Sequence, residues 1–233
     1  MMVWRRLQGS LRAGRRTGPQ VRPSSRSIVP TNLPSPPAST TRDGHERREA
    51  IFRDILRPLR PGRLLDLGTG HGAFATVAHE LGWQVTAVDA RTSRMPMTPG
   101  IDWVQSDVRA YDVSGFDCIA LLGLLYHLEY ADVVDLLRRC AGTVTILDTH
   151  TANHVTGIED GYEGRSFTEI ADYTPERLVE TPTASWGNPT SWWPTRQALV
   201  RMLEDVGFGT ILVLDPPTQA DRTFYLCLPP ASR

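Results

Sequence analysis

The sequence contains no lysine, so arginine supplies all 25 of its basic residues. It has only three cysteines, Cys118, Cys140 and Cys227, which are widely spaced and each lie in an apolar stretch. An odd number without metal-ligand spacing favours buried thiols in a reducing compartment, which predicts a cytoplasmic protein. No apolar run approaches the roughly 20 residues that a membrane-spanning helix needs, so we expect no membrane partner.

Acidic residues are absent from residues 1–42, which hold eight arginines and many Pro, Ser and Thr residues. This composition cannot bury a core, so the segment is predicted to be a disordered basic leader. A transit peptide has a similar composition, but an unstructured tail is the favoured interpretation. The remaining residues, 43–233, carry 17 basic and 26 acidic residues, which makes a nucleic-acid partner unlikely on charge grounds.

Hydrophobic periodicity in residues 43–233 alternates between strand and helix patterns, which predicts an α/β domain with a parallel sheet covered on both faces. The alternation stops after Thr151, and residues 151–194 are rich in Gly, Pro, Thr and aromatic residues. A long loop of this kind is usually a lid or a binding loop, so we expect an acceptor-binding insertion there. The expected strands cover 62–68, 84–90, 101–107, 116–123, 143–150, 209–215 and 223–228, and the expected helices cover 43–59, 72–83, 130–142 and 195–208.

The segment "LLDLGTGHGAF" places glycines where a predicted strand turns into a helix, so that the backbone can approach a ligand. Gly68 and Gly70 also satisfy a dinucleotide-binding pattern, which alone is a weak signal. Asp66 stands two positions before Gly68, where its carboxylate would repel a pyrophosphate and attract an ammonium group. A nucleoside that carries a cationic amino-acid tail is therefore the better ligand, and His71 is expected to line it.

Two more acidic residues follow predicted strands. Asp89 ends the second strand, where a carboxylate can accept hydrogen bonds from ribose hydroxyls. Asp107 ends the third strand in "QSDV", where it can accept from an adenine amino group beside the backbone of Val108. Each acid alone could be a turn or cap residue, but three at successive strand ends point to one shared ligand site.

These motifs resemble class I S-adenosylmethionine-dependent methyltransferases. The resemblance covers residues 45–228 and rests on "DLGTGHG", "VTAVDA", "QSDV" and "FDCIALLGLLYHL". It implies a Rossmann-like seven-stranded, mostly parallel sheet with helices on both faces, and S-adenosyl-L-methionine as the cofactor. It also implies that Asp66, Gly68 and Gly70 contact the methionine part of the cofactor, Asp89 the ribose and Asp107 the adenine.

The segments "GLLYHL", "ILDT" and "SWWPT" narrow the resemblance to one branch of these enzymes. That branch holds tRNA wobble-uridine carboxymethyltransferases and many small-molecule and glycan methyltransferases, among them a mycofactocin-oligosaccharide methyltransferase. The chain lacks the long basic N-terminal half of the tRNA enzymes. A small-molecule or glycan acceptor is therefore expected rather than tRNA.

An aliphatic hydroxyl acceptor needs a base for its proton, and histidine suits that role near neutral pH. His127 follows the fourth predicted strand and is the favoured base, with a packing or capping histidine as the alternative. His150 and His154 lie at and beyond the end of the fifth strand, on the same side, and are further candidates. The run "DTHTANH" holds only two histidines and one acid with turn residues between them, so no metal site is predicted.

Aromatic and polar residues are expected to contact the acceptor, and Tyr126, Tyr162, Arg165, Trp186 and Trp192 are the candidates. Trp193 is expected to pack structurally, because Pro194 and a capping Thr195 fix the start of the next helix beside it. The resulting hypothesis is O-methylation of a small molecule or glycan. An RNA (tRNA) modification enzyme and a non-catalytic partner subunit are the alternatives, and the oligomeric state stays open.

Overall fold

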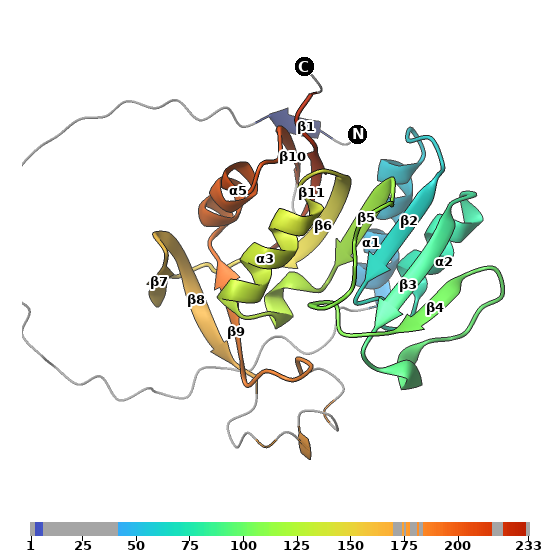
Figure 1. Ribbon diagram of the computed structural model, residues 1–233. Helices are drawn as coiled ribbons and strands as arrows, with labels where there is room; N and C mark the ends of the chain where they lie inside the picture. Colours follow the sequence, from blue (N-terminus) through green and yellow to red (C-terminus); the bar gives the residue numbers. More distant parts are fainter. Residues whose placement is uncertain are drawn as a thin grey trace, which may run out of the picture.

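The computed structural model describes residues 3–6, 42–169, 174, 176, 177, 181, 184–215 and 221–231. A large twisted sheet forms the centre of the molecule, and helices cover both of its faces (Figure 1). Its strands are β1 (Val3–Arg6), β2 (Arg63–Leu67), β3 (Gln84–Asp89), β4 (Asp102–Gln105), β5 (Cys118–Leu122), β6 (Val144–His150), β10 (Thr210–Asp215) and β11 (Arg222–Leu228).

The strand order is β1-β10-β11-β6-β5-β2-β3-β4. Strands β2 to β6 pair in parallel, whereas β11 runs antiparallel to both β6 and β10. Strands β2 to β6, together with β10 and β11, make up seven strands. They confirm the predicted Rossmann-like, mostly parallel sheet. The order reverses between β2 and β5, and ligands of such folds bind outside the carboxyl ends of strands at this point.

Each strand residue faces one of two apolar clusters, because successive side chains of a strand point to opposite faces. Leu64 packs with the cluster under α1 (Arg42–Leu56) and α2 (Ala73–Glu80). Leu65 packs with the cluster under α3 (Tyr130–Cys140) and α5 (Arg196–Asp205). Both clusters continue across the parallel strands, which is why these strands read as unbroken apolar runs in the sequence.

Residues 151–194, expected to be irregular, contain a second sheet. Its strands are β7 (Gly157–Glu159), β8 (Tyr162–Thr168) and β9 (Thr190–Pro194), in the order β7-β8-β9 and antiparallel throughout. Pro194 does not disrupt this sheet because it is the last residue of an edge strand. The "SWWP" segment is therefore a strand, which corrects the prediction that its tryptophans lie on a loop.

Four residues of the predicted disordered leader form a strand. Val3–Arg6 pairs antiparallel with Leu212–Asp215 of β10, whose outer edge would otherwise expose unpaired backbone groups. The prediction of disorder is thus corrected for residues 3–6. Residues 1–2 and 7–41 of the predicted leader lie outside the described residues, and its last residue, Arg42, begins α1.

Candidate functional site

The glycine loop after β2 has the backbone geometry that close approach to a ligand requires. Gly68 and Gly70 have φ angles of 72° and 55°, a region that side chains disfavour. A Cβ at Gly68 would lie 3.0 Å from a side-chain carbon of Leu124, whereas nothing lies within 4 Å of a Cβ built at Gly70. The loop therefore leaves open space beside Gly70, and the residues present fit the predicted nucleoside ligand.

Asp66 is 2% exposed and lies beneath this loop. Its Oδ2 accepts a 2.7 Å hydrogen bond from the hydroxyl of Thr69. Burial, reinforced by the negative charge of Asp89, raises the pKa of Asp66 to about 6, although the Thr69 hydrogen bond opposes this. A buried carboxylate in this state gains from a cationic ligand group, as the sequence predicted for an ammonium.

Asp89 and Asp107 both lie at the carboxyl edge of the sheet, as predicted. The Asp89 carboxylate accepts the backbone N–H groups of Gly70 (2.9 Å) and Arg91 (2.8 Å), which fixes its orientation toward the glycine loop. Asp107 accepts hydrogen bonds from the backbone and guanidinium of Arg109. Burial raises the pKa of Asp107, but the Arg109 hydrogen bonds outweigh this effect and hold that pKa below its usual value.

The arginines beside these two acids bind one segment of the insertion, which we call the lid segment (Ala184–Gly187). Arg91 donates from Nη2 to the carbonyl of Ala184 at 2.9 Å, and its guanidinium lies 5.3 Å from the ring centroid of Trp186. Arg109 donates to the carbonyl of Trp186 at 3.2 Å. Trp186 therefore lies beside the predicted cofactor acids rather than beside the candidate bases.

His127 ends the short helix η2 (Leu125–His127), which follows β5. Its Nδ1 lies 3.4 Å from the hydroxyl of Ser185 in the lid segment and 3.7 Å from the carboxylate of Glu169. The imidazole is 30% exposed, and its Nε2 makes no hydrogen bond with any described residue. The ring is thus held on one side and open on the other.

Glu169, which directly follows β8, accepts three hydrogen bonds at this edge. Its carboxylate accepts from the backbone N–H and the hydroxyl of Ser185 and from the hydroxyl of Ser191. Its side chain is 5% exposed. Burial alone raises the pKa of Glu169, but the hydrogen bonds and the proximity of His127 outweigh burial and keep that pKa below its usual value.

The backbone around His127 is anchored to the insertion. Asn188 donates from its amide to the His127 carbonyl at 3.0 Å, and Trp193 donates from Nε1 to the Tyr126 carbonyl at 2.8 Å. The backbone N–H of Trp192 donates to the backbone carbonyl of Leu128 at 2.9 Å. Strand β9 therefore positions the whole η2 turn.

His150 is a poorer base than His127. Its Nε2 lies 3.1 Å from Nη1 of Arg222 and its Nδ1 lies 3.2 Å from the carboxylate of Asp221, so both ring nitrogens face charged groups. Burial and then the positive charge of Arg222 lower the pKa of His150, although Asp221 opposes them. Its ring stacks on Trp193 with centroids 5.4 Å apart, which indicates a packing role.

The two faces of the β8–β9 pair separate the acceptor candidates. Trp193 and its cross-strand neighbour Arg165 lie on one face, where the Trp193 ring contacts Tyr126 and Phe167. Trp192 points the other way into the core under α3, where it is 3% exposed. Trp193 is itself only 7% exposed and packs against Tyr126, Phe167 and His150, which is the packing role expected of it, whereas Trp192 lies in the core rather than on this face.

Tyr162 lies on the same face as Trp192, and its hydroxyl donates to Asp205 of α5 at 2.6 Å. It therefore lies away from His127. His71 and His154 are exposed, and neither shares a hydrogen bond or ring contact with His127 in the described part of the chain. Val108 is 8% exposed, with its side chain in the core, so only its backbone can reach a ligand, as predicted.

A buried ion cluster joins α1 to the sheet beside Tyr126. Asp148 of β6 is fully buried and accepts from Nε of Arg48 at 2.6 Å. It also accepts from Arg222 of β11 at 2.9 and 2.8 Å. Arg222 in turn lies over the Tyr126 ring, 5.3 Å from its centroid, so the cluster supports the η2 turn from below.

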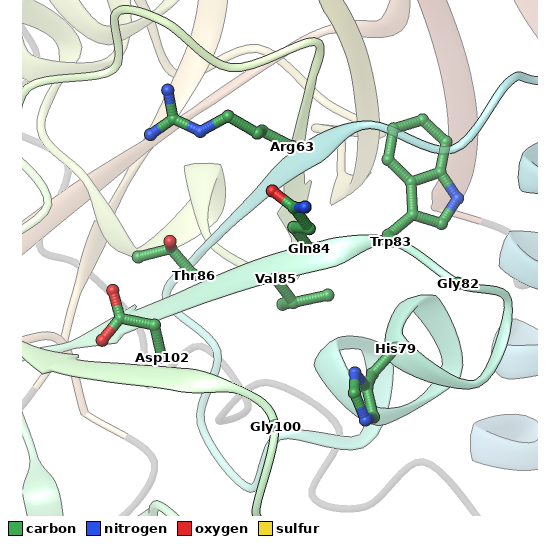
Figure 2. A pocket seen from close by; sticks show the side chains of 9 residues that line it. All are labelled: Arg63, His79, Gly82, Trp83, Gln84, Val85, Thr86, Gly100 and Asp102. Atoms are coloured by element: carbon green, nitrogen blue, oxygen red, sulfur yellow. The ribbon is translucent and has the colours of Figure 1, made fainter.

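A hollow of about 470 Å³ opens at the other end of the sheet. Figure 2 shows the side chains that line it, which include Gln84 and Asp102 at the amino ends of β3 and β4 and His79 in the last turn of α2. Five residues of extended strand, about 17 Å, separate Gln84 from Asp89 at the carboxyl edge. The hollow is therefore not part of the site described above. Within the described ranges, no group of three or more His, Cys, Asp or Glu residues is arranged to hold a metal ion.

Sequence reasoning missed Glu169, Ser185, Arg91 and Arg109. Glu169 and Ser185 lie in the segment without periodicity, and neither forms a motif with His127, which is 42 and 58 residues away. Arg91 and Arg109 each stand two residues after a predicted cofactor acid. That repeated acid-x-Arg spacing was a visible signal, although it did not show which segment the arginines bind.

Comparisons with known proteins agree with this geometry. The profile of a family described as "Methyltransferase domain" matches residues 44–213. Two solved structures of the N-terminal domain of EvdMO1 are similar. The one with SAH bound is 24% identical, with a TM-score of 0.63 and 82% of each chain covered. The one in the presence of SAH and D-fucose is 25% identical, with a TM-score of 0.62 and coverage of 83% of this chain and 85% of that one.

Two further solved structures share the fold at lower identity. One is Burkholderia thailandensis 1,6-didemethyltoxoflavin-N1-methyltransferase, which is 18% identical over 81% of this chain and 79% of that chain, with a TM-score of 0.57. The other is the glycopeptide N-methyltransferase MtfA, which is 18% identical over 78% of this chain and 87% of that chain, with a TM-score of 0.53. A search of the curated proteins found no match. Because the family profile covers most of its length, the chain belongs to the methyltransferase domain family, as the resemblance predicted.

Proposed function

We propose that the chain transfers the methyl group of S-adenosylmethionine to a hydroxyl of a small molecule or glycan. The observation that carries the proposal is the state of His127, whose Nδ1 side is held by Ser185 and Glu169 while its Nε2 side is free of hydrogen bonds to described residues. A base in this state can accept a proton from an acceptor hydroxyl. The same lid segment that contacts His127 is bound by the arginines beside the cofactor acids.

The carboxyl edge fits the donor. Asp66 would pair with the ammonium of the methionine tail, while Gly68 and Gly70 let the backbone come close to it. Asp89 keeps acceptor capacity for ribose hydroxyls, and Asp107 would share its carboxylate between Arg109 and the adenine amino group. When bound, S-adenosylmethionine supplies an electrophilic methyl group on a positively charged sulfur.

The acceptor side is lined by rings and one cation. The Trp193 ring contacts Tyr126 and Phe167 in this region, and Arg165 lies over the Phe167 ring with its Nε buried and without a hydrogen bond to a described residue. Flat rings stack on sugars and aromatic compounds, and an arginine can donate to their oxygens. The EvdMO1 domain, crystallised in the presence of D-fucose, supports a sugar as the first acceptor class to test.

RNA modification and a non-catalytic partner role are the alternatives. Arg109 pairs with Asp107 and Arg91 donates to a lid carbonyl. The described residues of the site show no basic stripe interleaved with aromatic rings that would support single-strand binding. The acidic and glycine positions of the donor site are all present, which argues for turnover rather than for a partner subunit. These alternatives predict different results in the experiment below.

Two substitutions test the proposal. Asp89→Ala should weaken S-adenosylhomocysteine binding at least tenfold in calorimetry, because the ribose and the Gly70 N–H both lose their acceptor. His127→Gln should leave that binding intact but lower methyl transfer to a hydroxyl acceptor by about 10²–10⁴-fold. Transfer is measured as S-adenosylhomocysteine release with a panel of monosaccharides that begins with D-fucose.

His79→Gln is the matched control, since His79 lies at the opposite end of the sheet, and it should change neither quantity. Full activity of His127→Gln would show that the base is elsewhere or unnecessary. Binding of the cofactor without turnover on any hydroxyl acceptor would favour the partner role. Steeply salt-dependent methylation of RNA would favour the RNA alternative.

A further inference from the structure

Glu169 is a charged group whose burial calls for an explanation. Its side chain is 5% exposed, and burying a carboxylate is costly unless hydrogen bonds and a nearby cation compensate. Three donors from two serines meet it. The imidazole of His127, with Nδ1 at 3.7 Å, is a cationic group beside it when protonated, and the positive charge of Arg91 also interacts with it.

The direction of the hydrogen bonds follows from counting protons. An ionised carboxylate only accepts, so Ser185 must donate its single hydroxyl proton to Glu169. The lone pairs of the Ser185 oxygen then face Nδ1 of His127 at 3.4 Å, and Nδ1 must be the donor in that contact. The direct distance from Nδ1 to Glu169 exceeds hydrogen-bond length, so the link runs through Ser185.

We propose that Glu169 and Ser185 form a relay that fixes His127 in its Nδ1–H tautomer and thereby makes Nε2 the base. Both are positioning residues, since neither faces the acceptor hydroxyl. This inference rests on the proposed function of His127. The long Nδ1 contact is expected to tighten in the complex with donor and acceptor, as catalytic hydrogen bonds often do.

The proton and charge balance of the step supports the assignment. The acceptor oxygen forms a bond to the methyl carbon while the bond from that carbon to sulfur breaks, and the hydroxyl proton moves to Nε2. The sulfonium loses its positive charge as the imidazolium gains one. Glu169, ionised throughout, stabilises that new cation from 3.7 Å through Ser185. The imidazolium then returns its proton to solvent.

The lid segment determines whether the relay exists. Ser185 lies between Ala184 and Trp186, whose carbonyls accept from Arg91 and Arg109. Glu169 also accepts the Ser185 N–H, which seats the segment from the other side. Both arginines stand beside predicted cofactor acids. The hydrogen bonds that hold Ser185 in the relay position are therefore made by residues that border the donor site.

The test is the tautomer of His127 in the full chain with S-adenosylhomocysteine bound. Ring nitrogen shifts from ¹⁵N NMR distinguish Nδ1–H from Nε2–H, and the His127→Gln spectrum assigns the signals. The wild-type protein should show Nδ1 protonated, and Ser185→Ala should shift the population toward Nε2–H. Ser191→Ala is the matched control, because it removes a hydrogen bond to the same carboxylate without touching His127 and should keep the wild-type tautomer.

An Nε2–H tautomer in the wild-type protein overturns the relay, as does an unchanged tautomer in folded Ser185→Ala. If Ser185→Ala does not fold, Ser185→Thr, which keeps the hydroxyl, must retain the Nδ1–H tautomer, and its loss there also overturns the relay. The spectrum does not depend on turnover. A correct tautomer without methyl transfer therefore disproves the proposed function alone, and methyl transfer with the wrong tautomer disproves the relay alone.

Discussion

Asp66 links the stability of the free protein to donor binding at the scale of one residue. Its carboxyl is buried and its pKa is raised to about 6. A raised carboxyl pKa means that the folded state binds a proton more tightly than the unfolded chain. Stability is then lost as pH rises from the unfolded pKa, near 4, through about 6, because the buried group must ionise. A bound ammonium would reverse this cost.

Asp66→Asn should therefore stabilise the ligand-free protein at pH 7.5 by up to roughly 3 kcal/mol, and by about half as much at pH 5. The same substitution should weaken S-adenosylhomocysteine binding and abolish its increase between pH 5 and pH 7.5. Thermal unfolding and calorimetry at both pH values measure the two effects. A variant that is less stable than wild type at pH 7.5 would contradict the assigned burial cost.

At the scale of elements, the β8–β9 pair controls where the rings and the relay lie. Gly164 of β8 faces the Trp192 ring so closely that a Cβ there would lie 2.5 Å from two ring atoms and 2.7 Å from the Trp193 carbonyl. Trp193 and Ser191 alternate with Trp192 along β9 and point to the other face. A shift of β9 would therefore displace the acceptor ring and a donor to Glu169 together.

Gly164→Ala should cost about 1–3 kcal/mol of unfolding free energy, because the overpacked strand has to move. Gly157→Ala is the matched control. Gly157 lies in β7, pairs with Gly164 of β8, and a Cβ built at Gly157 meets nothing within 4 Å. It should change stability by less than about 0.5 kcal/mol. Denaturant unfolding measures both, and equal losses in the two variants would refute the packing explanation.

At the scale of the whole molecule, α1 takes part in two ion pairs of different kinds, one with the sheet and one with α2. The buried cluster joins Arg48 to Asp148, which also binds Arg222. The exposed pair joins Arg53 to Glu80 of α2, with side chains 32% and 52% exposed. Removing one partner of a buried pair strands a charge away from water, whereas exposed pairs contribute little because solvent screens them.

Asp148→Asn should cost about 3–5 kcal/mol, because two buried guanidiniums lose their shared carboxylate. Glu80→Gln removes the exposed ion pair between Arg53 of α1 and Glu80 of α2, and it should lower the unfolding free energy by at most about 1 kcal/mol. Unfolding free energies in low and 1 M salt give the comparison. A buried-pair loss as small as the exposed one would show that α1 is held by its apolar face alone.

The sequence by itself determined the parallel strands and the helices of the main sheet, and it predicted the donor site. Apolar runs defined the parallel strands, glycines marked the turn after β2, and acids stood at the carboxyl ends that a parallel sheet brings to one edge. Thr195 was also correct as the cap of α5, where it accepts from the Ala198 N–H. These features depend on local pattern and on the direction of the strands, which neighbouring residues specify.

Only the tertiary structure decided the acceptor side. Whether Trp192 or Trp193 lies against Tyr126 depends on the register of β9, because a shift of one residue moves every side chain of a strand to the opposite face. The contact of Glu169 with His127 depends on how the insertion folds back over η2, and no local pattern encodes it. The donor site could be predicted because its residues follow consecutive strands. The relay of His127, Ser185 and Glu169 could not be predicted, because its members come from segments that meet only when the chain folds.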